Sequence, residues 1–357
     1  MPERSAQHFA RAAAAEAGGA LLEVRGLTTH YFTDEGVVRA VDGVDFTLAR
    51  GRTLCVVGES GSGKSVTARS ILQLVDAPGR IVAGEILFRP KPGETIDITR
   101  LGSRGPGIRK IRGREIAMIF QEPMSSLSPV HSIGDQIAEA IVLHFGVSRR
   151  EATERSIEML RRVGIPKAAS RFSAYPFQLS GGMRQRAMIA MALSCGPKLL
   201  IADEPTTALD VTTQAGILDL IRNIQEETGM AVLFITHDLG VVAEVADDVV
   251  VMYLGTVAER GDVDSIFHDP QHPYTRALLR SIPRLGLERR DRLESIRGMV
   301  PHPFDRPSGC PFHPRCDAFM PGVCDRIMPP TETLAEGRDV RCLLHSDVAA
   351  LTQGAVS

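Results

Sequence analysis

The sequence contains no tryptophan, few other aromatic residues and no long apolar stretch. Aromatic residues make up 5% of the 357 residues, and the formal net charge at pH 7 is −2. A near-neutral chain offers no excess of positive charge to nucleic acid, so we expect no nucleic-acid partner. No run of about 18 apolar residues is present, so no membrane-spanning helix is predicted. The apolar segment 12–15 is interrupted by Glu16, and without an export signal the sequence predicts a protein that stays in the cytosol.

Cysteine is also scarce, but its distribution is uneven. Six cysteines are too few for a disulfide framework in a chain of 357 residues. Four of them lie near the C-terminal end: Cys310, Cys316, Cys324 and Cys342. In a reducing compartment such a set indicates a metal site or a chance grouping before it indicates disulfides.

Short apolar runs and helical patterns alternate along most of the chain. Residues 1–20 are rich in alanine without an apolar period and are expected to form a mobile extension. Residues 90–113 are rich in glycine, proline and arginine and are expected to form a loop. Beyond about residue 269 proline, histidine, arginine and cysteine dominate, which predicts an irregular C-terminal extension over 269–357. Buried strands are predicted at 53–57, 116–120, 199–202, 231–235 and 249–253. Helical patterns between them predict an α/β fold with a parallel sheet.

The strongest motif occupies residues 58–65 and fits G-x-x-x-x-G-K-[ST] between a predicted strand and a predicted helix. Glycines let backbone N–H groups surround a phosphate, and the helix N-terminus adds positive potential. Lys64 is expected to reach the β- and γ-phosphates of ATP, and the Ser65 hydroxyl to ligate Mg²⁺. A plain glycine-rich turn is the alternative. The predicted phosphate-binding residues are Gly58, Glu59, Ser60, Gly61, Ser62, Gly63, Lys64 and Ser65.

A second motif is an apolar strand that ends in Asp203 and Glu204. Asp203 at the edge of a sheet can hold Mg²⁺, directly or through water. Glu204 can polarise a water molecule for attack on the γ-phosphate. An acidic residue after a strand can also be an ordinary helix cap, but the phosphate-loop motif upstream favours the catalytic interpretation.

Residues 179–186, which include Ser180, Gly181 and Gly182, resemble the signature motif of ABC-type ATPases. The other motifs of that family follow in order. Gln121 resembles the Q-loop glutamine, Asp210 the D-loop aspartate and His237 the switch histidine. Tyr31 occupies the place of the aromatic residue that stacks on adenine, with Phe32 as a neighbouring candidate.

The resemblance covers about residues 21–268 and implies a P-loop NTPase fold of the ABC type. That fold combines a RecA-like core sheet, an antiparallel β region and a helical subdomain, here at about 122–195. The family mechanism implies two ATPase subunits closing head to tail over two ATP molecules. Ser180, Gly181 and Gly182 would then act on the ATP of the other subunit, and Asp210 would take part in communication across the dimer.

The resemblance also assigns chemical roles. Gln121 and Asp203 would join Ser65 at Mg²⁺, and Glu204 and His237 would be catalytic. Together these residues imply an ATPase that uses ATP and Mg²⁺.

Residues 120–129 and 268–275 resemble the oligopeptide/dipeptide branch, the peptide/nickel class of ABC importers. The resemblance implies an ATP-hydrolysing subunit, a translocase component on the cytoplasmic face of the bacterial inner membrane. It also implies two permease subunits, a second ABC ATPase subunit with a heterodimer favoured, and an extracytoplasmic solute-binding protein. The resemblance does not identify the transported solute, and peptides, glutathione, nickel chelates and opines are all candidates. The alternative is a soluble ABC ATPase acting on nucleic acid or ribosomes. It is disfavoured because the chain has one nucleotide-binding unit and no room for a long coiled coil.

The spacing of Cys310, Cys316, Cys324 and Cys342 does not match the close cysteine pairs typical of zinc sites. The segment 310–316 resembles the extension of branch members that carry a [4Fe–4S] cluster, and we expect such a cluster in a structural role. Zinc, with His313 or His345 as a further ligand, and four structural or surface thiols are the alternatives.

Overall fold

The computed structural model describes residues 19–122, 126–207, 209–281, 296–334 and 338–354. This part of the chain forms two compact units. The first unit consists of residues 19–22, 48–53 and 87–235, and the second of residues 23–47, 54–86 and those from 236 onward. Each unit is described separately. Most of the expected extension 1–20 lies outside the described residues.

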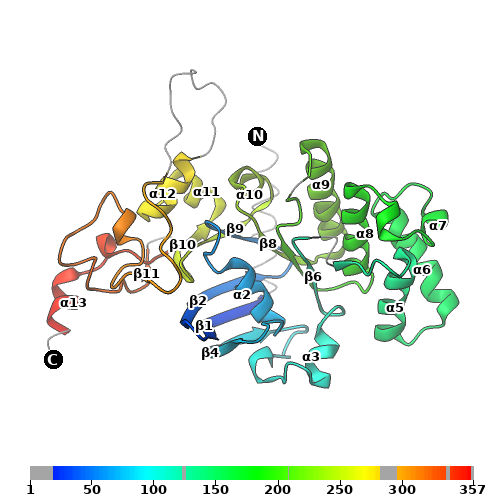
Figure 1. The fold of residues 1–357 in the computed structure, drawn as a ribbon, viewed down its shortest axis with the longest axis horizontal. Helices are drawn as coiled ribbons and strands as arrows, with labels where there is room; N and C mark the ends of the chain where they lie inside the picture. Colours follow the sequence, from blue (N-terminus) through cyan, green and yellow to red (C-terminus); the bar gives the residue numbers. More distant parts are fainter. Residues whose placement is uncertain (1–18, 123–125, 208, 282–295, 335–337, 355–357) are drawn as a thin grey trace, which may run out of the picture. The chain divides into compact units, whose positions relative to one another are not determined.

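The first unit contains three parallel strands and a group of helices. The strands are β6 (Ile116–Ile119), β7 (Leu199–Asp203) and β8 (Ala231–Ile235), in the order β8-β7-β6. Each residue of β7 and β8 is buried, which explains their continuous apolar sequence. The helices α5 (Ile133–Phe145), α6 (Arg149–Arg162), α7 (Ala168–Arg171) and α8 (Gly181–Leu193) pack together (Figure 1). Helix α9 (Val211–Thr228) lies between β7 and β8 in sequence.

The helix boundaries in this unit follow ordinary capping chemistry. Ser132 and Ser148 precede α5 and α6, and each side chain accepts a hydrogen bond from a backbone N–H of the first turn. Helices α5 and α9 end at Gly146 and Gly229, whose φ angles of 65° and 68° suit glycine.

The expectation of a loop over 90–113 is right for only part of the segment. This segment forms β5 (Ile96–Asp97), a 3₁₀ turn (Ile98–Arg100) and α3 (Pro106–Ile111). Ile98 and Ile108 are fully buried, so tertiary packing outweighs a composition that by itself favours a loop. Proline at the first position of α3 is compatible with a helix start.

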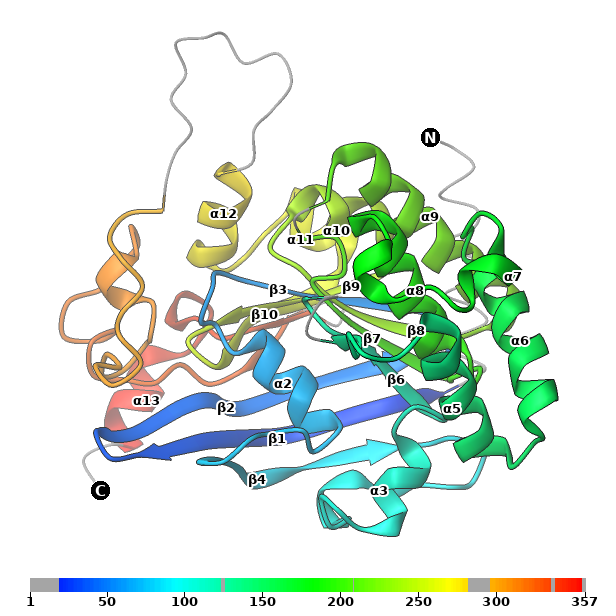
Figure 2. The same cartoon turned by 45° about the vertical axis from the view of Figure 1, so that its right-hand side comes forward.

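The second unit holds an antiparallel region and a mixed sheet. The long strands β1 (Ala20–Thr33) and β2 (Gly36–Ala49) lie beside β4 (Gly79–Phe88), in the order β2-β1-β4, as Figure 2 shows. In the mixed sheet β3 (Thr53–Val57) pairs in parallel with β9 (Asp248–Tyr253). Beyond β9 follow, all antiparallel, β10 (Thr256–Asp262), β12 (Asp339–Val340) and β11 (Glu332–Thr333). The predicted strands at 53–57 and 249–253 are therefore confirmed, as are those of the first unit.

The helices of the second unit are short. They are α2 (Lys64–Ile71), α10 (Leu239–Val245), α11 (Val263–His268), α12 (Pro273–Arg280) and α13 (Val348–Gly354), with 3₁₀ turns at His313–Arg315 and Leu343–His345. The C-terminal extension is thus more regular than its composition predicts. Within the described residues, no helix combines the length and hydropathy needed to cross a membrane.

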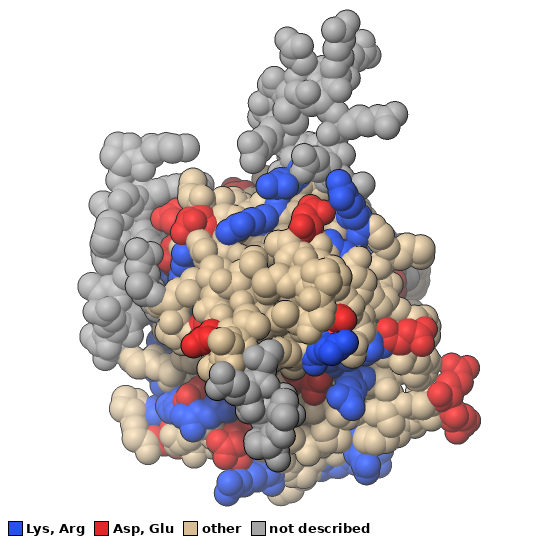
Figure 3. Space-filling model, turned by 90° about the vertical axis from the view of Figure 1, so that its left-hand side faces the viewer, with Lys and Arg blue, Asp and Glu red and all other residues tan. Residues whose placement is uncertain are grey.

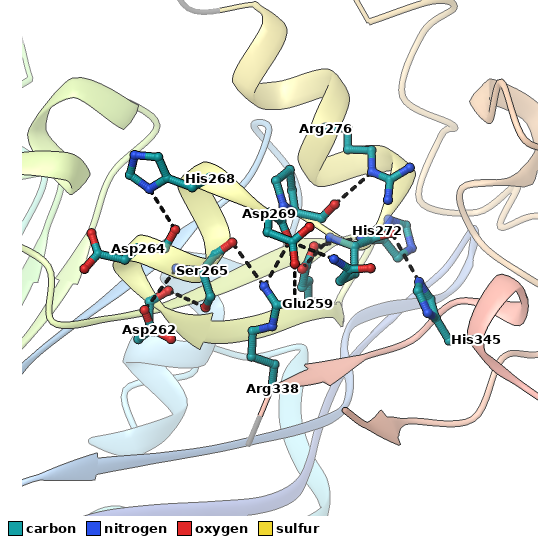
Figure 4. A network of polar contacts seen from close by, with 12 residues as sticks. Glu259, Asp262, Asp264, Ser265, His268, Asp269, His272, Arg276, Arg338 and His345 are labelled. Atoms are coloured by element: carbon teal, nitrogen blue, oxygen red, sulfur yellow. Dashed lines mark hydrogen bonds and ion pairs between the residues drawn. The ribbon is translucent and has the colours of Figure 1, made fainter. Parts of the chain in front are cut away.

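A polar network fastens the extension to β10 (Figure 4). Glu259 is fully buried, and its carboxylate accepts hydrogen bonds from the backbone N–H groups of Gln271 (2.7 Å) and His272 (2.9 Å). Arg338, whose side chain is 7% exposed, pairs with the Asp269 carboxylate at 2.8 Å. Because a buried charge is stable only when it is paired, these contacts hold α12 and β12 against β10.

The surface of the extension carries several exposed apolar side chains: Met299, Phe319, Met328 and Leu344. In Figure 3 the middle of one face shows few charged side chains, and most Lys, Arg, Asp and Glu residues lie around it.

Candidate nucleotide-binding site

The phosphate loop of the second unit joins β3 to α2 and has a conformation that requires glycine. Gly58 has a φ of 149°, and a Cβ atom there would lie 2.2 Å from the Met252 carbonyl oxygen. Gly63 has a φ of 98°, and its Cβ would lie 2.3 Å from the Ala40 carbonyl oxygen. Any side chain would therefore displace the backbone around the loop. This close approach supports the prediction of a backbone cradle for phosphate.

Lys64 lies over the loop that precedes it. Its ammonium group donates hydrogen bonds to the carbonyl oxygens of Gly58 (2.8 Å) and Glu59 (2.9 Å), and it lies 3.4 Å from Ser62 Oγ. Lys64 is 6% exposed. A positive charge is thus held at the loop, where an anionic phosphate would be bound.

The aromatic candidates for adenine lie on β1 and differ in their surroundings. The Tyr31 ring packs against Gly79, where an added Cβ would lie 2.6 Å from Tyr31 Cε1. Phe32 is 38% exposed, and the Arg80 guanidinium lies 4.2 Å from the centre of its ring. The adenine contact of Tyr31 stays a prediction.

His237 is exposed in the segment between β8 and α10. Its neighbour Asp238 caps α10 by accepting hydrogen bonds from the N–H groups of Gly240 (2.8 Å) and Val241 (3.3 Å). The cap of α10 is therefore supplied by Asp238 and leaves the His237 side chain out of this role.

In the first unit the structure brings two predicted residues together. Gln121 Nε2 donates a hydrogen bond to Glu204 Oε2 at 3.1 Å, although the two are 83 positions apart. Glu204 has a φ of 48°, which is uncommon for a residue other than glycine. Asp203, at the end of β7, is 2% exposed. An unusual backbone conformation at a carboxylate of this kind is typical of functional sites.

Thr207 is a contact of this carboxylate that sequence reasoning missed. Its hydroxyl donates a hydrogen bond to Glu204 Oε2 at 2.9 Å. The signal was present, because a threonine three positions after an acidic residue can reach back to it within one turn of chain.

The signature segment forms the N-terminus of α8. Ser180 Oγ accepts a hydrogen bond from the Met183 N–H at 3.3 Å and so caps the helix. Among the described residues nothing lies within 4 Å of a Cβ added at Gly181, whereas one added at Gly182 would lie 2.9 Å from Thr213. Ser180 and Gly181 are exposed, so this helix end is open to a ligand on its outer side.

Asp210 caps the neighbouring helix α9. Its carboxylate accepts hydrogen bonds from the Thr213 hydroxyl (2.7 Å) and the Thr213 N–H (3.0 Å), and these bonds lower the pKa of the Asp210 carboxyl. Gln185 of α8 donates to the Pro205 carbonyl oxygen. The predicted signature and D-loop residues therefore occupy two adjoining helix starts.

The four C-terminal cysteines line one small cavity in the second unit, together with His272, Phe312 and His313. Cys310, Cys324 and Cys342 are buried, and Cys316 is intermediate. Burial raises the pKa of Cys310 to about 12 and that of Cys342 to about 11, and it also raises the pKa of Cys316. Within the described ranges, no three His, Cys, Asp or Glu side chains gather closely enough to hold a single metal ion.

The two histidines considered for zinc make other contacts. His313 Nδ1 lies 3.0 Å from the Cys310 carbonyl oxygen, and His345 Nε2 lies 3.4 Å from the Gln271 carbonyl oxygen. The described residues therefore provide no close ligand set for a single zinc ion. The two histidines do not add a ligand to the cluster interpretation either.

Comparisons with known proteins agree with this picture. Residues 41–207 match the model of the ABC transporter family, and residues 258–324 match the C-terminal region of oligopeptide/dipeptide transporters. A putative peptide import ATP-binding protein of Brucella ovis is 52% identical over 336 residues, which are 92% of this chain and 98% of that protein. The dipeptide transport ATP-binding protein DppD of Escherichia coli is 47% identical over 323 residues, 90% of this chain and 96% of that one.

Among solved structures, the post-hydrolysis dimer of the ATP-binding cassette MJ0796 with ADP and phosphate is similar, with a TM-score of 0.60 and 27% identity. The match covers 68% of this chain and 98% of that one. The predicted ABC-type fold is thereby confirmed. The chain belongs to the ABC transporter family of ATPases, in the branch of the oligopeptide/dipeptide transporters.

Proposed function

We propose that this ATPase energises the import of peptides or related small solutes through a membrane ABC transporter. One observation carries the solute class: a C-terminal region of the oligopeptide/dipeptide transporter type follows an ATP-binding cassette in the same chain. Relatives named for peptide import and for oligopeptide transport match over 92% of the chain and support the same conclusion.

The proposed chemistry divides among residues of the two units. In the second unit Gly58, Lys64 and the backbone between them would bind the phosphates, and the glycine-only cradle supports this role. In the first unit Glu204 would polarise the attacking water, oriented by Gln121 through their hydrogen bond. Mg²⁺, when bound, neutralises charge on the phosphates; by motif its proposed ligands are Ser65, Gln121 and Asp203.

The remaining roles rest on the same motifs. His237 is proposed as a catalytic residue, Tyr31 as the adenine contact and Asp210 as a dimer-communication residue. Ser180, Gly181 and Gly182 are proposed to act on the ATP of a second subunit, which the open start of α8 supports. The proposed domain organisation has three parts: an N-terminal extension at 1–20, a nucleotide-binding domain at 21–268 with a helical subdomain at about 122–195, and a C-terminal extension at 269–357.

The proposed assembly contains two permease subunits, a second ABC ATPase subunit in a heterodimer, and an extracytoplasmic solute-binding protein. In it the chain sits peripherally on the cytoplasmic face of the bacterial inner membrane. The test is purification of the tagged chain from solubilised membranes, followed by reconstitution. Copurified permeases, and an ATPase rate raised by peptide with the binding protein, support the proposal. Lys64→Ala is the inactive control. Copurification with ribosomes, and stimulation by RNA instead of peptide, would favour the soluble ATPase.

We further propose that Cys310, Cys316, Cys324 and Cys342 hold a [4Fe–4S] cluster with a structural role. All four line one cavity, and their sequence spacing lacks the close cysteine pairs typical of zinc sites. Burial keeps the pKa of Cys310 high, so binding to iron would have to displace its proton. Such a cluster would tie the segment around 310–342 into one compact unit.

The cluster is tested by anaerobic purification with iron, sulfide and zinc analysis and an absorption spectrum. We expect iron and sulfide near four each per chain, as a [4Fe–4S] cluster requires, and we expect both to be lost in Cys316→Ser. Cys195→Ser is the matched control, because Cys195 is a buried thiol at 7% exposure outside the cavity. A colourless folded protein with one zinc would favour zinc. A metal-free protein whose stability is unchanged by Cys316→Ser and Cys324→Ser would leave four structural or surface thiols that hold no metal.

A further inference from the structure

A buried arginine of the cysteine segment contacts the phosphate loop. Arg315 lies in the 3₁₀ turn between Cys310 and Cys316, and its side chain is 3% exposed. Its guanidinium binds the Glu59 carboxylate with two bonds, from Nη1 to Oε2 at 2.6 Å and from Nη2 to Oε1 at 3.0 Å. Two parallel bonds between a planar guanidinium and a carboxylate fix orientation as well as charge. Glu59 is the second residue of the loop, so the pair joins positions 256 residues apart.

The backbone of the same loop residue is held by a second group from beyond residue 269. The Glu59 N–H donates a hydrogen bond to the Tyr274 hydroxyl at 2.9 Å, and Tyr274 is fully buried. The Tyr274 ring packs against Tyr253 and Phe312, with ring centres 4.7 Å and 5.3 Å away. Both the side chain and the amide of Glu59 are therefore fastened to the C-terminal part of the chain.

Arg315 is itself held firmly from the other side. Its Nε donates to the Arg297 carbonyl oxygen at 2.9 Å, and Nη1 lies 3.3 Å from the Tyr253 hydroxyl. An arginine with its donors satisfied by fixed partners transmits the position of its own segment to the carboxylate that it binds. A displacement of the segment 310–316 would reach the loop through this contact.

The consequence for nucleotide binding follows from the chemistry of the loop. Phosphate is bound by backbone N–H groups, which must all point to one place. A loop that is ordered only on binding costs conformational free energy, and a loop already held in place avoids that cost. Contacts that hold Glu59 should therefore strengthen ATP binding without touching ATP.

We propose that Arg315 is a positioning residue for the phosphate loop: by holding Glu59 it keeps the loop ready for nucleotide, so the C-terminal extension sets the affinity for ATP. The other charged ties of the extension do not reach the loop. Arg338 pairs with Asp269 (2.8 Å), and Arg306 pairs with Asp42 (2.5 Å). The Arg306 pair docks the extension on β2 and the Arg338 pair lies within the extension, whereas the Arg315 pair alone among these three ends on a phosphate-loop residue.

The experiment uses the full-length chain in the assembled transporter. Arg315→Ala should raise the KM for ATP, and the Kd measured by calorimetry, by about three- to thirtyfold, the range typical of residues that couple through others. The kcat at saturating ATP should change much less. Arg315→Lys should lie between, because lysine restores the charge but not the two-pronged geometry.

Arg338→Ala is the matched control, since it removes another buried arginine of the same extension, 7% exposed, that is paired with a carboxylate, here the exposed Asp269. It should lower the melting temperature but leave the KM for ATP unchanged. If Arg315→Ala alters the KM no more than Arg338→Ala does, the positioning role is refuted.

A double variant asks whether Arg315 acts through Glu59. Glu59→Gln should itself raise the KM, and Arg315→Ala with Glu59→Gln should be no worse than the more damaging single change. If the two substitutions instead raise the KM independently, so that their fold-changes multiply in the double variant, the proposal is overturned. If Arg315→Ala does not accumulate as folded protein, Glu59→Gln decides by itself, because a wild-type KM in that variant would show that the contact does not serve the loop. Failure of the proposed peptide import would appear as lost stimulation by peptide, and it would leave these nucleotide measurements intact.

Discussion

Glu204→Gln separates the chemical role of this carboxylate from its structural role. In the structure Glu204 Oε2 accepts two hydrogen bonds, from Gln121 Nε2 at 3.1 Å and from Thr207 Oγ1 at 2.9 Å. The backbone N–H of Glu204 bonds independently to the Ile235 carbonyl oxygen at 2.9 Å, and this bond is unaffected by a change of side chain. A glutamine amide oxygen can accept the same two side-chain bonds, so the substitution keeps the local arrangement and removes only the charge and the basic oxygen.

The substitution is expected to change the free energy of unfolding only slightly and the rate of hydrolysis strongly. Both side-chain bonds are solvent-accessible, so the loss of charge assistance should lower the free energy of unfolding by about 1 kcal/mol or less. Loss of a general base lowers the rate of hydrolysis by about 10²- to 10⁴-fold. At 1.36 kcal/mol for each factor of ten, this is about 2.7 to 5.4 kcal/mol of transition-state stabilisation. ATP binding should survive, and a closed ATP-bound dimer should accumulate.

The assay is the ATPase rate of the assembled transporter, measured together with ATP affinity and thermal unfolding of the same preparations. Thr207→Val is the control, because it removes one bond to the Glu204 carboxylate but keeps the charge, and its kcat should fall by less than about tenfold. A Glu204→Gln transporter with wild-type kcat would refute the assignment of Glu204. A large loss of stability would show instead that the carboxylate serves mainly to hold the structure.

Other substitutions test the remaining parts of the structure. Gly63→Ala should lower the free energy of unfolding by about 1 to 3 kcal/mol and abolish ATP binding, because φ is 98° and the added Cβ would meet a backbone oxygen at 2.3 Å. Gly61→Ala, with nothing within 4 Å of its Cβ, should be milder in chemical denaturation. Asp210→Ala should destabilise α9 by about 0.5 to 2 kcal/mol through loss of its cap, and Asp210→Asn should restore most of that stability in thermal melts. Burial, and then Arg114, lower the pKa of His144 below 6.5, so the unfolded chain binds more protons just below that pH and stability should rise as the pH rises through this window. His144→Gln should make the melting temperature depend less steeply on pH between about pH 5 and pH 7, with the remaining slope due to His30 and His272, whose pKa values burial also lowers; an unchanged slope would contradict this account.

The proposed nucleotide site could be formulated from sequence because its chemistry is local. A phosphate loop needs small residues, a lysine and a hydroxyl at fixed spacing, since consecutive backbone N–H groups bind the phosphate. The strand that carries Asp203 and Glu204 is short, apolar and fully buried, so it could be recognised from its composition. Such features depend on residues that are close together in the chain, so they can be recognised from the sequence alone.

Composition misled where burial depended on distant partners. The segment 90–113 contains glycines and prolines, yet Ile98 and Ile108 are fully buried within a turn and a helix. Local preference is weak compared with the free energy of burying large aliphatic side chains, and only the folded chain determines which side chains are buried.

The sequence by itself determined that this chain is an ATPase of the ABC type, because phosphate chemistry requires particular residues at particular spacings. Only the tertiary structure decided which distant residues hold those motifs in place. Gln121 reaches Glu204 across 83 positions, and Arg315 reaches Glu59 across 256 positions. No periodicity or spacing connects such pairs. Their contact results from how the whole chain packs, since that packing determines which charges are buried together and must pair.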